Sequence, residues 1–224
     1  MAAESLAGLA ALLADGTRAR FCLELMDGRA WTAGELAAVA GVAASTASEH
    51  LSRLVAAGLL VERRQGRHRY VRLAGQREAK LLEDLLSYLG PTPPPRRTLS
   101  SSRATEALAR GRTCYDHLAG RLGVAITEAM TARALLTPDL TLTPEGRTWL
   151  TTTLDATLPT TRPPTRSCLD WTERRLHLAG PAAAHLCAHF QEHDWIRKVG
   201  TTRAVTVTPK GKKALHDLLA LSLP

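Results

Sequence analysis

Apolar positions between residues 32 and 73 are arranged as in two short helices followed by a β-hairpin. Leu36 and Val39 give the first segment an apolar side. In the second segment the apolar residues follow the i, i+4, i+7, i+8 spacing of a helix that buries one stripe: Ala47, Leu51, Leu54 and Val55. Residues 59–63 and 68–73 are strand-like. This order of elements is that of a winged helix-turn-helix.

Local signals support the same elements. Thr32 and Glu35 have capping-box spacing, so each can satisfy a free backbone N–H at the start of the first helix. Gly41 supplies the turn between the helices, because glycine adopts a positive φ at little cost. Ser45 is a good N-cap residue, and we expect the second helix to begin near it.

The polar face of the second predicted helix is rich in small hydroxyl side chains. Short side chains let a helix approach the DNA major groove closely and donate to phosphates or base edges. Six arginines lie between residues 53 and 72, and residues 44–72 contain two carboxylates, so the local charge is 6 − 2 = +4. The alternative is a solvated basic hairpin on a small fold. We predict DNA contacts in the major groove by Ser45, Thr46, Ser48, His50 and Arg53, and along the adjacent backbone or minor groove by Arg64, Arg67, His68 and Arg69.

Two amphipathic segments flank this region. Residues 4–14 carry a helical leucine stripe that must pack on something, because short isolated helices are marginal in water. Residues 17–26 predict the next helix, with Cys22 as a buried thiol. Residues 75–89 have a broad leucine face. We expect that face to pack on its twin in a second subunit; the alternative is packing on the C-terminal half of the chain.

The proline-rich residues 91–102 predict a linker, since four prolines favour an extended spacer. We therefore expect a winged-helix domain over residues 1–90 and a C-terminal domain over residues 103–224. The latter contains an internal repeat, with copies at about 114–156 and 168–221 that both include a Thr-Pro-x-Gly motif. The predicted fold class is mainly α with small β-hairpins (α+β), and the C-terminal domain would consist of two degenerate winged-helix-like units that serve packing, dimerisation or signal reception.

Composition narrows the functional class. The net charge of +8 favours an anionic partner, here nucleic acid. No apolar stretch approaches the roughly 18 residues of a membrane-spanning helix, so we expect no membrane association. The N-terminus lacks a basic-then-apolar signal, and the four widely spaced cysteines do not suggest a disulfide framework, so a cytoplasmic location is expected. No glycine-rich phosphate loop or catalytic motif suggests an enzyme.

The two repeats carry matching thiols, carboxylates and imidazoles that are candidates for an effector site: Cys114, Asp116, His117, Cys168, Asp170 and His177. Thiolate with imidazole suits zinc, a similar ion or a thiol-reactive signal. The alternatives are a purely structural role and a pocket for an organic ligand, so we assign no metal ligand and no cofactor from sequence. A second group, His185, Cys187, His189 and His193, has helical spacing but would be partly solvated.

The N-terminal region resembles the ArsR-type winged-helix repressors over about residues 4–90. The matching segments are 13–18, Ser45-Thr46 with Ser48 and His50-Leu51, 57–60, and 66–70. The resemblance implies a homodimer that binds a two-fold symmetric operator and releases it on a signal. Two metal sites common in the family are not matched, because residues 35–39 contain no cysteine and residues 75–89 contain no histidine.

From these observations we predict a homodimeric transcriptional regulator of double-stranded DNA, a repressor released by a small-molecule or metal effector. The alternative function is a ligand- or metal-binding module whose winged helix mediates protein contacts.

Overall fold

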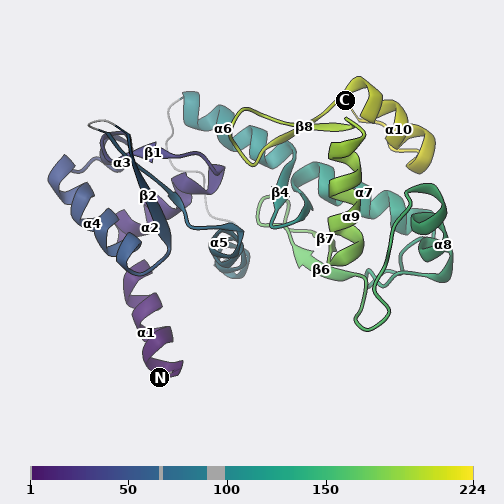
Figure 1. Ribbon diagram of the computed structural model, residues 1–224, viewed down its shortest axis with the longest axis horizontal. Helices are drawn as coiled ribbons and strands as arrows, with labels where there is room; N and C mark the ends of the chain where they lie inside the picture. Colours follow the sequence, from purple (N-terminus) through teal and green to yellow (C-terminus); the bar gives the residue numbers. More distant parts are fainter. Residues whose placement is uncertain (1, 66–67, 90–98, 224) are drawn as a thin grey trace. The chain divides into compact units, whose positions relative to one another are not determined.

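The computed structural model describes residues 2–65, 68–89 and 99–223. The chain forms two compact units, residues 1–82 and 83–224 (Figure 1). The division falls inside helix α5 (Gln76–Leu89), eight residues before the predicted boundary at residue 90. Residues 91–98 of the predicted linker lie outside the described residues. Residues 99–102 instead form the start of helix α6 (Leu99–Arg110), because no proline follows Pro95 in this segment.

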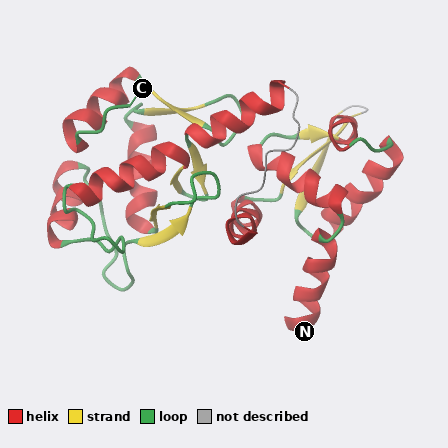
Figure 2. Ribbon diagram, turned by 180° about the vertical axis from the view of Figure 1, so that it is seen from behind, coloured by secondary structure: helices red, strands yellow, loops and turns green. Residues whose placement is uncertain are grey.

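The prediction of a mainly helical protein with small antiparallel hairpins is confirmed, and Figure 2 shows helices as the main element of both units. The first unit consists of α1 (Ala2–Leu13), α2 (Gly16–Glu24), a 3₁₀ turn η1 (Leu25–Asp27), β1 (Trp31–Thr32), α3 (Ala33–Ala40), α4 (Ala44–Ala56), β2 (Leu60–Gln65) and β3 (His68–Leu73). Its three strands form an antiparallel sheet of order β1-β3-β2, in which Leu60 pairs with Leu73 and Gln65 with His68. These are the elements of a winged helix-turn-helix.

The local signals around the helix-turn-helix are confirmed with one correction. Thr32 and Glu35 form the capping box, and Gly41 ends α3 with φ of 71°. Ser45, however, is not the N-cap of α4. The helix begins one residue earlier, with Ala43 as N-cap and no side-chain cap, because the amide of Ala47 already bonds to the Ala43 carbonyl. Ser45 therefore lies in the first turn with its side chain exposed.

The second unit contains, after α6, the elements β4 (Arg112–Cys114), β5 (His117–Ala119), α7 (Gly120–Ala132), α8 (Pro144–Thr153), β6 (Arg166–Leu169), β7 (Leu176–Ala179), α9 (Pro181–Glu192), β8 (Ile196–Lys198), β9 (Val205–Val207) and α10 (Pro209–Leu219). Three antiparallel hairpins form, β4-β5, β6-β7 and β8-β9. Isolated antiparallel bridges join Leu136 to Leu142 and Arg112 to Ala204. In the part of the chain that the structure describes, no helix is both long and apolar enough to cross a membrane.

After α6, the elements of the second unit follow a similar order twice. The first series is the β4-β5 hairpin, α7, the Leu136–Leu142 bridge and α8, and the second is the β6-β7 hairpin, α9, the β8-β9 hairpin and α10. Thr143 and Thr208 cap α8 and α10, and each hydroxyl accepts the amide of the glycine three residues on. A Cβ on Gly146 would lie 2.0 Å from the Leu135 carbonyl oxygen, and one on Gly211 would lie 2.1 Å from that of Trp195. Both copies therefore need glycine where the second helix crosses the end of the first, which explains the repeated Thr-Pro-x-Gly motif.

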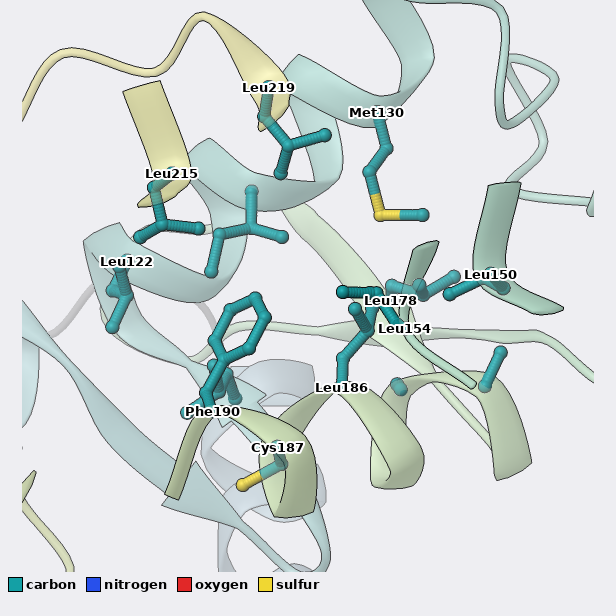
Figure 3. Close-up of a cluster of buried hydrophobic side chains, with 14 of the residues drawn as sticks. Leu122, Met130, Leu150, Leu154, Leu178, Leu186, Cys187, Phe190, Leu215 and Leu219 are labelled. Atoms are coloured by element: carbon teal, nitrogen blue, oxygen red, sulfur yellow. The ribbon is translucent and has the colours of Figure 1, made fainter. Parts of the chain in front are cut away.

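The core of the second unit draws leucines from both copies. Figure 3 shows Leu122 and Met130 of α7, Leu150 of α8, Leu186 and Phe190 of α9, and Leu215 and Leu219 of α10 around one interior. Each of these side chains is at most 4% exposed. The elements also cross between the copies, because α7 packs on β7 and α9 packs on β5. The two segments that the sequence predicts as repeats therefore share one hydrophobic core.

Candidate functional site

Helix α4 presents one open polar face. Ala47, Leu51 and Leu54 bury its other side completely, against the rest of the first unit. Ser45 and Arg53 are exposed, and Thr46 and Ser48 are half-buried. These four predicted DNA-contacting side chains therefore belong to a surface that a duplex can reach, while the apolar stripe holds the helix in place.

His50 lies at the edge of this surface, where it also contacts α2. Its side chain is 16% exposed, its Nδ1 lies 3.4 Å from the guanidinium of Arg18 and 3.7 Å from Asp15, and its ring meets Phe21 edge to face. Arg18 in turn donates to the carbonyls of Ala11 and Leu12 at the end of α1. His50 therefore packs against α2 from the edge of the polar face, a contact that the helical spacing alone did not indicate, and its predicted groove contact stays a prediction.

The hairpin β2-β3 carries the predicted basic wing. Arg64 is exposed and pairs across the strands with Arg69. Arg67 lies outside the described residues, and the backbone of His68 begins β3. Arg63 and Arg72 of the same hairpin are exposed as well, so the described part of the wing presents three arginines to solvent.

Arg69 connects the wing to α4. Its guanidinium contacts Glu62 Oε2 at 2.5–2.6 Å and donates to the Ser52 hydroxyl at 3.3 Å. The Glu62 carboxylate therefore balances the charge of Arg69, and the bond to Ser52 links the hairpin to the polar face of α4. Glu62 and Ser52 were not among the predicted site residues, because cross-strand and helix-to-strand contacts are not visible in local spacing.

In the second unit, the six predicted effector residues gather at the two equivalent hairpins. Cys114 pairs across β4-β5 with His117, and Cys168 pairs across β6-β7 with His177. All four side chains are buried, and one ligand atom from each lies within 4.8 Å of the others. The Nε2 atoms of His117 and His177 are 3.1 Å apart. We call these four residues the Cys-His cluster. Its two sulfurs and two nitrogens are a possible metal-binding set, although the sequence alone assigned no metal ligand.

The two predicted aspartates lie on the outer side of the imidazoles. Asp116 Oδ1 is 3.1 Å from Nδ1 of His117, and Asp170 Oδ2 is 3.8 Å from Nδ1 of His177. Asp170 also accepts from Arg112 at 3.0 Å and from the Gly120 amide at 2.6 Å. Burial alone would raise the pKa of Asp170, but the Arg112 guanidinium and these hydrogen bonds outweigh it, so that the pKa is lowered.

A buried ion network adjoins the cluster, and sequence reasoning missed it. Arg112 is 0% exposed and lies between Asp170 and Glu83, whose Oε1 atom also meets Arg203 at 3.0 Å. The Cys114 thiol lies 2.7 Å from Glu83 Oε2. Nothing in the local pattern separates Arg112 from the many surface arginines, since only the packing of β4 against other elements buries it.

The two cysteines of the cluster have opposed acidities. The hydrogen bond from Cys114 lowers the pKa of Cys168 against the effect of burial, and the imidazoles of His117 and His177 lower it further. The pKa of Cys114 is raised by the same hydrogen bond, by burial and by the Glu83 carboxylate. Cys168 is therefore the sulfur that ionises first.

The second histidine group is held structurally. Nε2 of His185 lies 2.7 Å from the Leu154 carbonyl oxygen, and Nδ1 of His193 lies 2.9 Å from that of His189. The rings of His189 and His193 stack with centroids 3.8 Å apart. Cys187 is buried in the hydrophobic cluster of Figure 3 and its thiol accepts from Gln191, so these residues do not converge on one point.

An apolar cavity of about 20 Å³ lies beside this core, lined by Leu118, Gly123, Ile126, Thr127, Leu178, Ala183 and Leu186. A space of that size holds about one water molecule. It does not fit the organic effector considered as an alternative.

Comparisons with known proteins agree with the helix-turn-helix geometry. The family described as "Helix-turn-helix domain" matches residues 13–63. An uncharacterised HTH-type transcriptional regulator of Bacillus subtilis, YdfF, is 36% identical over 225 residues, which covers 98% of this chain and 99% of that protein. The HTH-type transcriptional regulator CmtR of Mycobacterium tuberculosis is 40% identical over 86 residues, 38% of this chain and 72% of CmtR.

Similar solved structures cover the first unit. The NMR structure of CmtR, described as a cadmium metal-sensor, aligns with 42% of this chain and 96% of its own, at 33% identity and a TM-score of 0.33. A homodimeric winged helix-turn-helix domain of a possible ArsR-family regulator from Mycobacterium bovis covers 42% of this chain and 89% of its own, at 26% identity and a TM-score of 0.35.

Proposed function

Because this chain belongs to the HTH-type transcriptional regulators, we propose that it is a homodimeric repressor that holds a two-fold symmetric DNA operator through α4 and the β2-β3 wing. The observation that supports this most directly is the joined surface: an open hydroxyl-rich face on α4, and a basic hairpin tied to that face through Arg69, Ser52 and Glu62. Phosphate contacts position such a surface on the duplex, and contacts to base edges make it selective.

Ser45, Ser48 and Arg53 are proposed to face base edges, and Arg64 to face the sugar–phosphate backbone. Arginine is the side chain that most often reads guanine in the major groove, through two hydrogen bonds. The exposed Arg64 on the wing suits a contact that depends on charge and little on sequence. The two sets are therefore separable by experiment.

A homodimer is supported by apolar side chains that the single chain leaves open. Helix α1 buries none of its residues, and Leu6 is 68% exposed. On α5, Leu85 and Leu89 are 41% and 73% exposed, and Tyr88 is 90% exposed. Because soluble monomers rarely expose such stripes, we propose that α1 and α5 meet their twins in a second copy.

Release by a signal is the remaining part of the proposal, and the second unit is its proposed receiver. The cytoplasm is the expected compartment, in keeping with four free cysteines among the described residues. The function needs no catalytic step.

Fluorescence anisotropy with the duplex upstream of the chain's own gene tests the proposal. The full-length protein should bind that duplex at least about 10³-fold more tightly than a shuffled one. Arg53→Ala should cost about 1–3 kcal/mol on the specific duplex and reduce the preference for it. The matched control is Arg147→Ala, which removes an exposed helical arginine of the second unit and should leave the affinity for both duplexes unchanged.

Arg64→Ala should weaken both duplexes alike and lower the slope of log affinity against log salt by about one. Equal, weak and strongly salt-dependent binding to every duplex by the unaltered protein would contradict the proposal. That result would favour the alternative, a module whose winged helix contacts protein.

A further inference from the structure

The two imidazoles of the Cys-His cluster leave a hydrogen-bonding problem unsolved. A neutral imidazole carries one proton and one lone pair on its two nitrogens. Nδ1 of His117 lies 3.1 Å from a carboxylate oxygen of Asp116, which accepts only, so the proton belongs there and Nε2 is a lone pair. That lone pair points at Nε2 of His177, 3.1 Å away.

Neither neutral form of His177 completes this arrangement. With its proton on Nδ1, near Asp170 Oδ2 at 3.8 Å, two lone pairs face each other. With its proton on Nε2, a bare Nδ1 faces a carboxylate, and Nδ1 has no hydrogen-bond partner among the described residues. A positive charge between the rings removes the repulsion between the two lone pairs and lets Nδ1 of His177 keep a proton beside Asp170. That charge is either an added proton or a metal ion.

The two sulfurs decide between these choices. Cys114 and Cys168 occupy the positions opposite His117 and His177 in their hairpins, so each hairpin offers one sulfur and one nitrogen to the same point. A proton on an imidazole serves the nitrogens only. A metal ion is bound by all four atoms.

We propose that Cys114, His117, Cys168 and His177 bind one divalent ion of the zinc class, and that this ion fastens the β4-β5 hairpin to the β6-β7 hairpin. Two sulfurs and two nitrogens form the donor set that selects zinc and similar borderline-soft ions over magnesium or calcium. The proposal is independent of DNA binding, since it concerns the second unit alone.

The geometry suits a four-coordinate ion. Tetrahedral zinc with bonds of about 2.3 Å to sulfur and about 2.0–2.1 Å to nitrogen holds neighbouring ligand atoms roughly 3.3–3.8 Å apart. The two Nε2 atoms are already at 3.1 Å, and the widest separation, 4.8 Å or less, requires a rotamer adjustment of about an ångström.

The surroundings match those of a closed structural site. Metal-bound histidines usually donate their other ring nitrogen to a carboxylate, which fixes the tautomer. Asp116 and Asp170 stand in that position, and Asp170 is itself held by Arg112 and the Gly120 amide. Each cluster residue is at most 8% exposed, which leaves no open coordination position for a substrate.

The test is the metal content of the full-length protein, purified without chelators and measured by elemental analysis beside a chromogenic zinc indicator. We expect one zinc per chain. Cys168→Ser and His177→Gln should reduce it to background. Cys187→Ala should retain one zinc per chain, because it removes a buried thiol that lies outside the Cys-His cluster.

Cobalt(II) gives a second readout that does not depend on the variants. Metal-free protein titrated with Co²⁺ should develop thiolate-to-metal charge-transfer absorption and the intense visible bands of tetrahedral cobalt, saturating at one equivalent, and zinc should abolish both. Weak octahedral bands, zinc that persists in both cluster variants, or a Cys114–Cys168 disulfide in the metal-free native protein by mass spectrometry would each overturn the proposal.

Discussion

The two units differ in where their functional polar groups lie: the first exposes them to solvent, and the second buries them. In the first unit an apolar stripe anchors α4, and the polar face of that helix stays in water. In the second unit the polar groups lie in the interior: Arg112, Asp170 and His177 are each 0% exposed. The exposed face can afford unmatched donors because water satisfies them, whereas every buried group must find a partner within the fold.

The two arginine networks illustrate the difference. Arg69 with Glu62 and Arg112 with Asp170 both join a guanidinium to a carboxylate across β-hairpin elements. The first pair is partly exposed, with 21% of the Arg69 and 34% of the Glu62 side chain in contact with water, so screening and side-chain entropy leave little net gain. The second pair is enclosed, so that losing one partner strands a buried charge.

The largest expected effect comes from breaking the buried network. Arg112→Ala leaves Asp170 and Glu83 without their shared cation and should lower the free energy of unfolding of the second unit by about 3–5 kcal/mol. Urea unfolding followed by circular dichroism measures this change. The matched control is Arg110→Ala, whose side chain is 61% exposed and whose loss should cost no more than about 1 kcal/mol. Equal losses would remove the contrast between the two environments.

Two glycines extend the comparison from charge to packing. Gly211→Ala places a Cβ 2.1 Å from the Trp195 carbonyl oxygen, so α10 must move, and we expect a destabilisation of about 1–3 kcal/mol. Gly34→Ala in α3 meets nothing within 4 Å and should stabilise the first unit by about 0.5–1 kcal/mol. Thermal unfolding of both variants tests the opposite signs, and a neutral Gly211→Ala would contradict the crossing-point argument.

A third effect depends on pH. Burial lowers the pKa of His189 below its ordinary value, and the neighbouring His193 and His185 lower it further. The imidazole of His189 therefore binds a proton more readily in the unfolded chain than in the folded one. The stability that comes from keeping His189 neutral is complete above about pH 6.5 and is lost as the pH falls through the pKa of the folded state.

Replacing His189 by Gln should flatten the fall in stability of the second unit between pH 7 and pH 5. His216→Gln, which changes an exposed histidine of α10, is the control and should leave the slope unaltered. Thermal midpoints across this pH range measure the slope. Identical slopes for the His189 variant and the unaltered protein would assign the pH dependence to another group.

The smallest effect on stability belongs to the exposed pair. Arg69→Ala should change the free energy of unfolding of the first unit by less than about 1 kcal/mol. Its effect should appear in DNA binding instead, as a moderate loss of affinity, because the link from the wing to Ser52 of α4 is gone. A large fall in the thermal midpoint with unchanged DNA affinity would show that Arg69 stabilises the fold and does not position the DNA-binding surface.

Much of the first unit was predictable because its signals are local. The Thr32–Glu35 capping box, the positive φ of Gly41 and the buried stripe of α4 each depend on residues within about two helical turns. The start of α4 near Ser45 was also predicted to within one residue, but the N-cap is Ala43 and not Ser45. The contact of His50 with α2 was also not foreseen, since angular position on a helix does not specify which neighbouring element packs there.

By itself, the sequence determined the order of helices and hairpins, the hydroxyl-rich face with its basic wing, and the repetition of a cysteine and a histidine in two places. Only the tertiary structure decided that those four side chains converge within 4.8 Å, that Arg112 and Glu83 enclose them in a buried network, and that His185, His189 and His193 do not form a comparable group. The physical reason is range. Capping and periodicity act between near neighbours along the chain, whereas the convergence of Cys114 with His177 depends on packing β5 beside β7 and α7 on β7, which joins residues about sixty positions apart.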